Sequence, residues 1–157
     1  MKKIFKFIGI LCIFAFLQAN EIDTLIESQL VQKQFLIVKS TKSYQEAKAF
    51  AKKISKQTGI PLNLQNLSYD KENLLTLPKD VCEDNGFEFP CYWARGRYDD
   101  GVYVSIEHSS AYEEFRNGYY IVMVASGENV KGILKKVKKV VKDAYIKTSK
   151  IYMGCVH

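Results

Sequence analysis

The sequence contains few of the side chains from which metal sites are built. Its 157 residues include two histidines, His108 and His157, and four cysteines, and no group of them has the spacing of metal ligands. Low-complexity segments and long linkers are also missing. These absences argue against a metal site, and we expect no cofactor. What is present is long enough to fold as one domain around its own hydrophobic core.

The first twenty residues, MKKIFKFIGILCIFAFLQAN, predict a secretory signal peptide. Three lysines come first, an almost unbroken apolar run covers residues 7–17, and Gln18-Ala19 follows. The apolar run is short for a membrane span. We therefore expect residues 1–19 to be removed after Ala19, which gives a periplasmic mature protein of 138 residues. The alternative is an uncleaved leader that anchors the protein to the membrane.

Half of the positive charge belongs to this leader. The whole chain has 23 basic and 17 acidic residues and a net charge of +6. The leader holds three lysines and no acidic residue, so 20 basic residues and a net charge of +3 remain after cleavage. A charge this small gives little support for a nucleic acid or another polyanion as the partner.

Three cysteines remain in the mature chain. Cys82 and Cys91 lie close together in the sequence, and an oxidising compartment favours a disulfide between them. Cys155 is then left over near the C-terminus. A buried thiol, a different pairing and a link to another chain are all open for it.

A strand–helix–strand pattern covers residues 35–66. The apolar run FLIVKS predicts a strand, and the segment LNLQN predicts a second one. Between them, Ser43 and Glu46 form a capping box at the start of a helix, and Gly59 marks its end.

The same pattern returns in residues 119–152. The strand YYIVMVAS is followed by apolar residues at helical spacing from Val130 to Val141, and AYIKTSKIYM predicts a final strand. A strand that ends in Ser126-Gly127 before a helix could cradle a phosphate. The further glycines or the Gly-Lys-Ser signature of such a loop are missing, so we interpret Gly127 as a turn residue.

An insertion, residues 68–118, separates the two copies. Its segment CYWARGRYDDGVYVSIEHS predicts a β-hairpin with its turn at residues 99–101. A short amphipathic helix is expected before the first copy, in residues 20–34. Two intercalated βαβ units give an α+β fold, a ferredoxin-like βαββαβ sheet with both helices on one face. We thus expect a single domain over residues 35–157 that the inserted hairpin extends.

The two copies are similar to the repeats of a known family. FLIVKSTKSYQEAKAFAKKISKQTGI resembles the first repeat of a SPOR (sporulation-related repeat) domain, and YYIVMVASGENVKGILKKVKKVVKDAYIK resembles the second. The resemblance implies a ferredoxin-like envelope module that binds peptidoglycan glycan strands without stem peptides on its open sheet face. The second copy departs from the family pattern, because Tyr119–Gly127 contains neither the arginine nor the Gly-Pro ending. No individual glycan contact is therefore transferred to this chain.

The segment YWARGRYDDGVY is the richest in aromatic and arginine side chains. In a hairpin strand, Trp93, Arg95 and Arg97 would share one face, and Tyr98 and Tyr103 follow close by. Aromatic rings stack on sugars, and arginines hydrogen-bond hydroxyls or carboxylates. These five residues are our candidate ligand-binding site, for a glycan or a peptide. The alternative is a hairpin whose aromatic cross-strand pairs serve its own stability.

Both faces of the strand around Tyr119–Val124 are apolar. The two helices would cover one face, so we expect the N-terminal helix or the hairpin to cover the other. A covered second face would argue against SPOR-type binding on the sheet. The lysines of the last helix are interpreted mainly as a solvated surface.

The sequence offers little support for catalysis. Glu107 and His108 are adjacent in a predicted strand, so their side chains point to opposite faces. We therefore expect an exported, non-catalytic binding module with peptidoglycan glycan as its ligand. One alternative is an interaction or inhibitor-type module that docks another envelope protein through the hairpin. The other is a cell-envelope hydrolase.

Overall fold

The computed structural model describes residues 27–127 and 130–154. The chain divides into two compact units, and the larger one runs from Gln32 to Ile151. In the smaller unit, the backbone N–H of Met153 donates to the carbonyl of Gln29 at 2.8 Å. The predicted signal peptide and Cys155 lie outside the described residues. Among the described residues, no helix has the length and apolar character needed to cross a bilayer.

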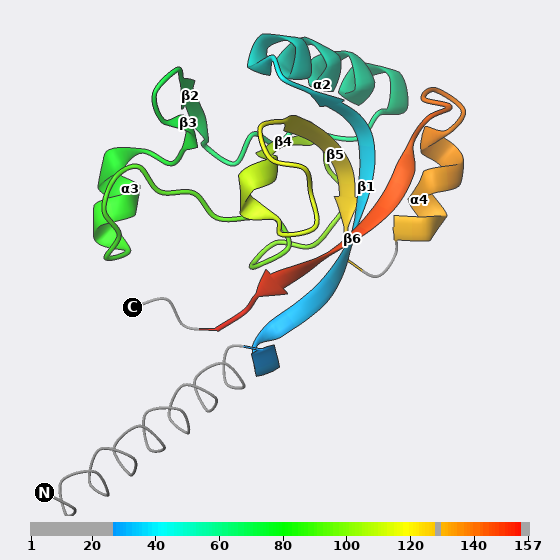
Figure 1. Cartoon of the computed structure of the whole chain (residues 1–157). Coiled ribbons are helices and arrows are strands. Elements are labelled where there is room, and N and C mark those ends of the chain that lie inside the picture. The colour runs from blue at the N-terminus through cyan, green and yellow to red at the C-terminus, as the bar shows by residue number, and fades with distance from the viewer. Residues whose placement is uncertain (1–26, 128–129, 155–157) are drawn as a thin grey trace, which may run out of the picture. The chain divides into compact units, whose positions relative to one another are not determined.

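The central element is a four-stranded antiparallel sheet with the strand order β4-β5-β1-β6 (Figure 1). The α+β class predicted from the sequence is confirmed. The most buried strand is β5, all seven residues of which are shielded from solvent, and it pairs with β1 on one side and β4 on the other. The strands of this sheet are β1 (Leu30–Thr41), β4 (Ser105–His108), β5 (Tyr120–Ser126) and β6 (Tyr145–Tyr152).

The first long helix, α2 (Tyr44–Thr58), has the predicted ends. The Ser43 side chain accepts a hydrogen bond from the backbone N–H of Glu46, and Gly59 closes the helix in the left-handed conformation. The Glu46 carboxylate does not complete the capping box. It accepts from the Thr41 hydroxyl and pairs with Lys39 instead, which ties the start of α2 to the end of β1.

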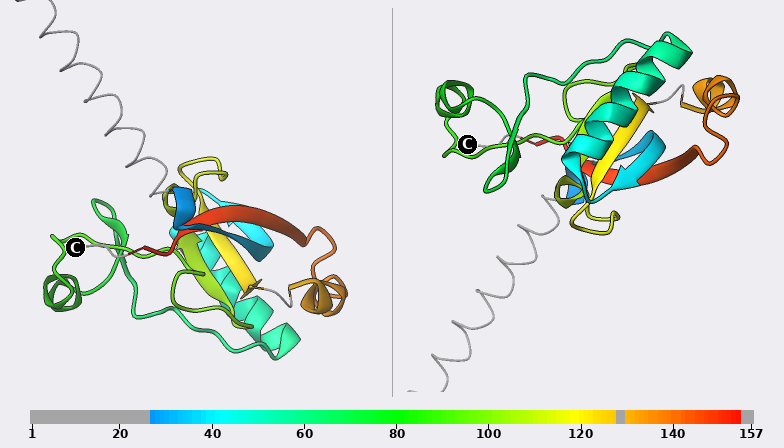
Figure 2. Two further views of the ribbon diagram at one scale, coloured as in Figure 1. Left: turned by 90° about the horizontal axis from the view of Figure 1, so that it is seen from below. Right: turned by 90° about the horizontal axis from the view of Figure 1, so that it is seen from above.

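Both long helices pack on the same face of the sheet. The shorter one, α4 (Val130–Val137), ends before Val141, the predicted end, although Val141 still packs against the core. Figure 2 shows α2 lying over β5. The core on this side is formed by apolar residues of both helices and of the strands, including Leu36, Val38, Ala47, Ala51, Ile54, Ile106, Val122, Val124, Val130 and Val137.

Part of the insertion covers the opposite face of the sheet. Phe35, Ile121 and Met123 are at most 1% exposed there, although α2 and α4 contribute to the core on the other face. The Tyr112 ring meets Phe35 edge-on, with 5.3 Å between ring centroids, and Phe115 packs beside it. The apolar pattern of β5 required that this second face of the sheet also be shielded from solvent. The segment that contains the 3₁₀ turn η1 (Ser109–Ala111) provides this shielding.

The segment LNLQN is not a strand of the sheet. Asn63 accepts a hydrogen bond from the Gln65 backbone, and Gln65 and Asn66 both have positive φ angles, so the chain turns here. Leu62 makes a single bridge to Val104, and β4 takes the expected place beside β5. The strand prediction for this segment was wrong because the preference of its few apolar residues for a strand is weak, and its short polar side chains stabilise a turn.

The predicted hairpin around residues 99–101 is also absent. Residues 91–100 form no strand, and the segment expected as the second arm becomes β4, which pairs with β5. Arg95 turns inward, and Gly96 lies so close to Phe35 that an added Cβ would be 3.0 Å from the ring. The alternating residues of this segment suggested a strand, but the chain folds inward instead so that Arg95 is buried.

Residues 20–34 were expected to form an amphipathic helix, and only their end can be compared. Residues 20–26 lie outside the described part of the chain, Glu27 and Ser28 are helical, and β1 begins at Leu30, inside the range predicted as helix. The strand predicted from the apolar run at Phe35 therefore starts earlier, at Leu30.

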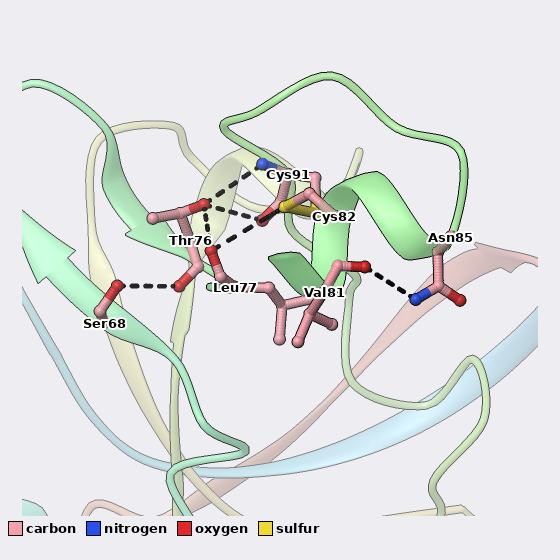
Figure 3. The surroundings of a disulfide bond; sticks show 7 residues. All are labelled: Ser68, Thr76, Leu77, Val81, Cys82, Asn85 and Cys91. Atoms are coloured by element: carbon pink, nitrogen blue, oxygen red, sulfur yellow. Dashed lines mark hydrogen bonds between the residues drawn. A yellow bond between two sulfur atoms is a disulfide. The ribbon is translucent and has the colours of Figure 1, made fainter. Parts of the chain in front are cut away.

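The disulfide between Cys82 and Cys91 is confirmed (Figure 3). It joins the short helix α3 (Lys79–Asp84) to the segment that follows it, with 5.8 Å between the Cα atoms. The buried Thr76 hydroxyl accepts from the Cys91 backbone N–H at 3.2 Å. Thr76 belongs to the small hairpin of β2 (Ser68–Asp70) and β3 (Leu74–Thr76), so the disulfide and this hydroxyl hold three parts of the insertion together.

Replacing both Cys82 and Cys91 by serine should lower the free energy of unfolding by about 2–3 kcal/mol, because the closed loop is short. Urea unfolding of the oxidised protein and of the double variant measures this difference. Reduction of the wild-type protein should give a similar loss. A non-reduced digest with both thiols free, or with Cys82 joined to Cys155, would contradict the pairing.

Candidate ligand-binding site

Arg95 is fully buried and makes four side-chain hydrogen bonds. Its Nε donates to the Ser126 Oγ at 3.1 Å, and its Nη2 donates to the Gly101 carbonyl at 2.9 Å. Its Nη1 donates to the Tyr103 carbonyl at 3.0 Å and to the Ser105 Oγ at 2.9 Å. The guanidinium also lies 3.6 Å from the centre of the Tyr103 ring. Arg95 is thus a structural anchor and presents no charge to a ligand at the surface.

A buried carboxylate lies in the same network. Glu107 is fully buried, and its Oε2 accepts from the Tyr92 hydroxyl. Its Oε1 has no hydrogen-bond partner within the described residues. Burial raises the pKa of Glu107 above its usual value, and the hydrogen bond from Tyr92, the Ser105 hydroxyl and the nearby Arg95 offset part of this rise.

The segment anchored by Arg95 carries a shallow hollow of about 190 Å³, which we call the Trp93 hollow. Trp93 is half-buried and meets the Phe87 ring edge-on at 5.3 Å between centroids. Tyr98 is 76% exposed, and the Arg97 guanidinium lies 5.0 Å from the centre of its ring. The hollow is lined by Gln65, Leu67, Leu77, Trp93, Ala94, Tyr98 and Asp99.

Asp99 is the only carboxylate among the residues that line the Trp93 hollow, and it is held in place from three sides. It accepts from the Gly96 backbone N–H at 3.2 Å, from the Gln65 Nε2 at 2.5 Å and from the Tyr103 hydroxyl. Burial raises the pKa of Tyr103, which keeps this hydroxyl protonated as a donor. Asp99 and Gln65 therefore form a fixed polar edge beside the aromatic rings.

The structure brings together only part of the site predicted from the sequence. Trp93 and Tyr98 line one hollow, and Arg97 stands beside Tyr98. Arg95 and Tyr103 instead support that hollow from the buried network. Sequence analysis missed Gln65, Leu67 and Leu77 as lining residues, because nothing in their local pattern signals a contact with the segment that contains Trp93 and Tyr98.

A second polar pair lies at the end of β4. The His108 Nδ1 is 2.6 Å from the Ser110 Oγ, and burial lowers the pKa of His108. The imidazole also accepts from the Ser110 backbone N–H and so caps η1. No carboxylate in the described part of the chain hydrogen-bonds this ring, and Glu107 points to the other face, toward Tyr92. The pair is better explained as a helix cap than as a nucleophile with its base.

The described residues contain no group of three histidine, cysteine or acidic side chains that could hold a metal ion. Comparisons with family models, curated proteins and solved structures give no match.

The raised pKa of Glu107 predicts a pH dependence of stability. The Glu107 carboxyl binds its proton more tightly in the folded state than in the unfolded state. Its protonation therefore adds to the free energy of unfolding, and this contribution is fully present below pH 4.5. It is lost as the pH rises through the folded-state pKa. Glu107→Gln removes this titration, so the unfolding free energy of the wild type relative to the variant should fall from pH 4.5 upward. Urea unfolding across pH 4 to 8 measures the difference.

Glu46→Gln is the matched control for this experiment. Hydrogen bonds from Lys39 and Thr41 lower the pKa of Glu46, so its contribution is lost as the pH falls. The two variants should therefore deviate from the wild type in opposite directions. A difference between wild type and Glu107→Gln that does not change with pH would contradict the account of Glu107.

Proposed function

We propose that this chain is an exported, non-catalytic binding module of the cell envelope, and that it holds a sugar ring of a cell-wall glycan in the Trp93 hollow. The observation that carries the proposal is the exposure of Tyr98 beside the half-buried Trp93. A large aromatic ring left in water next to a second ring is typical of a recognition surface. The leader sequence and the disulfide are compatible with export.

The chemistry of the hollow suits an uncharged sugar. Trp93 and Tyr98 can offer aromatic faces to the C–H groups of a ring, and the apolar side chains of Leu67 and Leu77 also line the hollow. Asp99 and Gln65 provide fixed polar atoms for hydroxyl groups. A hollow of about 190 Å³ is smaller than the usual pocket for a drug-sized ligand. One ring of a longer chain is therefore the expected occupant.

We further infer that the sheet and the two long helices form a ferredoxin-like βαββαβ core. The order β4-β5-β1-β6, with α2 after β1 and α4 after β5 on one face, supports this topology. It also supports the SPOR resemblance. The cover formed by Tyr112 and Phe115 disfavours a ligand spread over that face of the sheet. Our proposal therefore assigns the glycan to the insertion.

The test is retention of the mature protein on purified peptidoglycan, with and without amidase treatment. Tyr98→Ala and Trp93→Ala should each weaken binding at least tenfold, because loss of an interface anchor typically costs about 2 kcal/mol or more. The melting temperature should stay nearly unchanged for Tyr98→Ala, since this ring is 76% exposed. Val140→Ala, which truncates an exposed apolar side chain that lines neither the Trp93 hollow nor the hollow on the sheet face opposite the helices, is the control and should bind as the wild type.

Other outcomes would replace the proposal. Retention of one envelope protein, with no retention on glycan, would favour the docking alternative at the same hollow. Release of soluble fragments from peptidoglycan would favour the hydrolase. Export is tested separately: the mature N-terminus should lie at or near Asn20, and an intact chain with Met1 in the cytosol would contradict it.

A further inference from the structure

We propose a second binding site, for a small organic oxyanion, on the sheet face opposite the helices. Its ligand class is a carboxylate or a phosphate carried on a ring-shaped body. The site is a hollow of about 210 Å³, which we call the Arg116 hollow. Its lining residues are Ser40, Phe115, Arg116, Tyr119, Ile121, Tyr145 and Lys147. None of these residues lines the Trp93 hollow, and the inference does not rest on the proposed function.

The floor of the Arg116 hollow is made by the sheet. Ser40 of β1 is paired directly with Ile121 of β5, so their side chains lie next to each other on one face. Tyr145 and Lys147 of β6 are two residues apart and therefore also share a face. Ile121 is buried and Tyr145 is 46% exposed, so an apolar base meets an accessible ring.

The wall of the hollow carries positive charges that rest on aromatic rings. The Arg116 guanidinium lies 5.8 Å from the centre of the Tyr119 ring, and the Nζ of Lys42, a residue outside the lining, lies 5.8 Å from the same ring centre. The Lys147 Nζ lies 4.5 Å from the centre of the Phe115 ring. Cation–π contacts restrict these long side chains, so less conformational entropy is lost when an anion binds them.

These three cations have no acidic partner among residues 27–127 and 130–154. No acidic residue is among those that line the hollow. Glu46 pairs with Lys39, and Glu114 accepts from the Ser149 hydroxyl and from the Lys150 backbone N–H. A hollow with unpaired cations and no free carboxylate attracts an oxyanion.

The combination of groups also selects the body of the ligand. An arginine fork and a lysine can hold a carboxylate or a phosphate together, with the arginine bidentate. Tyr145 and Ile121 then offer an apolar surface to whatever carries the charge. An inorganic ion would contact only the cationic side chains, whereas a ring-bearing oxyanion would contact both the cationic side chains and the apolar surface.

The test is a titration of the mature, disulfide-bonded protein followed by amide NMR shifts at Ile121 and Lys147. The probes are benzoate and phenyl phosphate, compared with acetate and inorganic phosphate. The two ring-bearing probes should bind at least tenfold more tightly than their ring-free counterparts. Preference between benzoate and phenyl phosphate distinguishes a carboxylate ligand from a phosphate ligand.

Variants locate the site. Arg116→Met with Lys147→Met should weaken phenyl phosphate and benzoate binding at least tenfold. Lys131→Met with Lys135→Met on α4 makes the same change in net charge at two exposed positions and should alter binding less than twofold. Tyr98→Ala should have no effect, which separates this site from the Trp93 hollow. Lys147→Met alone serves if the double variant loses its native spectrum, and it should weaken binding severalfold.

Three results would overturn the inference. Equal affinity for the ring-bearing and the ring-free probes would show that the apolar residues of the hollow do not contribute to binding. Equal losses of probe affinity in the Arg116–Lys147 and Lys131–Lys135 double variants would show that binding depends only on the net charge of the protein. Shifts that persist unchanged in both Arg116 and Lys147 variants would place the anion elsewhere on the protein.

Discussion

The buried guanidinium of Arg95 joins the insertion to the sheet, and the Trp93 hollow lies on the segment that this junction anchors. A charge without water is costly unless its donors are satisfied, and four hydrogen bonds to the chain meet this requirement. Two acceptors are the Ser105 and Ser126 hydroxyls of β4 and β5, and two are carbonyls of the segment that follows Arg95. Residues 95–103 are therefore folded back around their own arginine.

This junction determines which surfaces of the protein are accessible to a ligand. The insertion places Tyr112 and Phe115 over apolar residues that an open sheet would expose to ligand or solvent. It then displays Trp93 and Tyr98 on its own outer side. Where the cover ends, Arg116 and Tyr119 form a hollow with the exposed ends of the strands. The segment between β1–α2 and β5–α4 thus contributes residues to both hollows.

Local signals in the sequence predicted the elements that depend on local physics. Ser43 and Gly59 defined the ends of α2, the continuous apolar run predicted β5, and the spacing of Cys82 and Cys91 predicted their disulfide. The predicted hairpin failed because Arg95 looked like a surface residue, and no local pattern shows that distant serines will satisfy it. The lining residues Gln65 and Lys147 were missed for the same reason, since their contacts arise only from tertiary packing.

Native-state hydrogen exchange tests the junction most directly. The Gly101 N–H donates to the Ser126 carbonyl at 3.1 Å, and the Ser126 N–H donates back to the Gly101 carbonyl at 3.0 Å. If Arg95 holds the insertion on the sheet, the Gly101 amide should exchange only when β5 opens, with the same free energy and denaturant dependence as the Val122 amide. Exchange of Gly101 through a local opening, at a free energy several kcal/mol below that of Val122, would contradict the account.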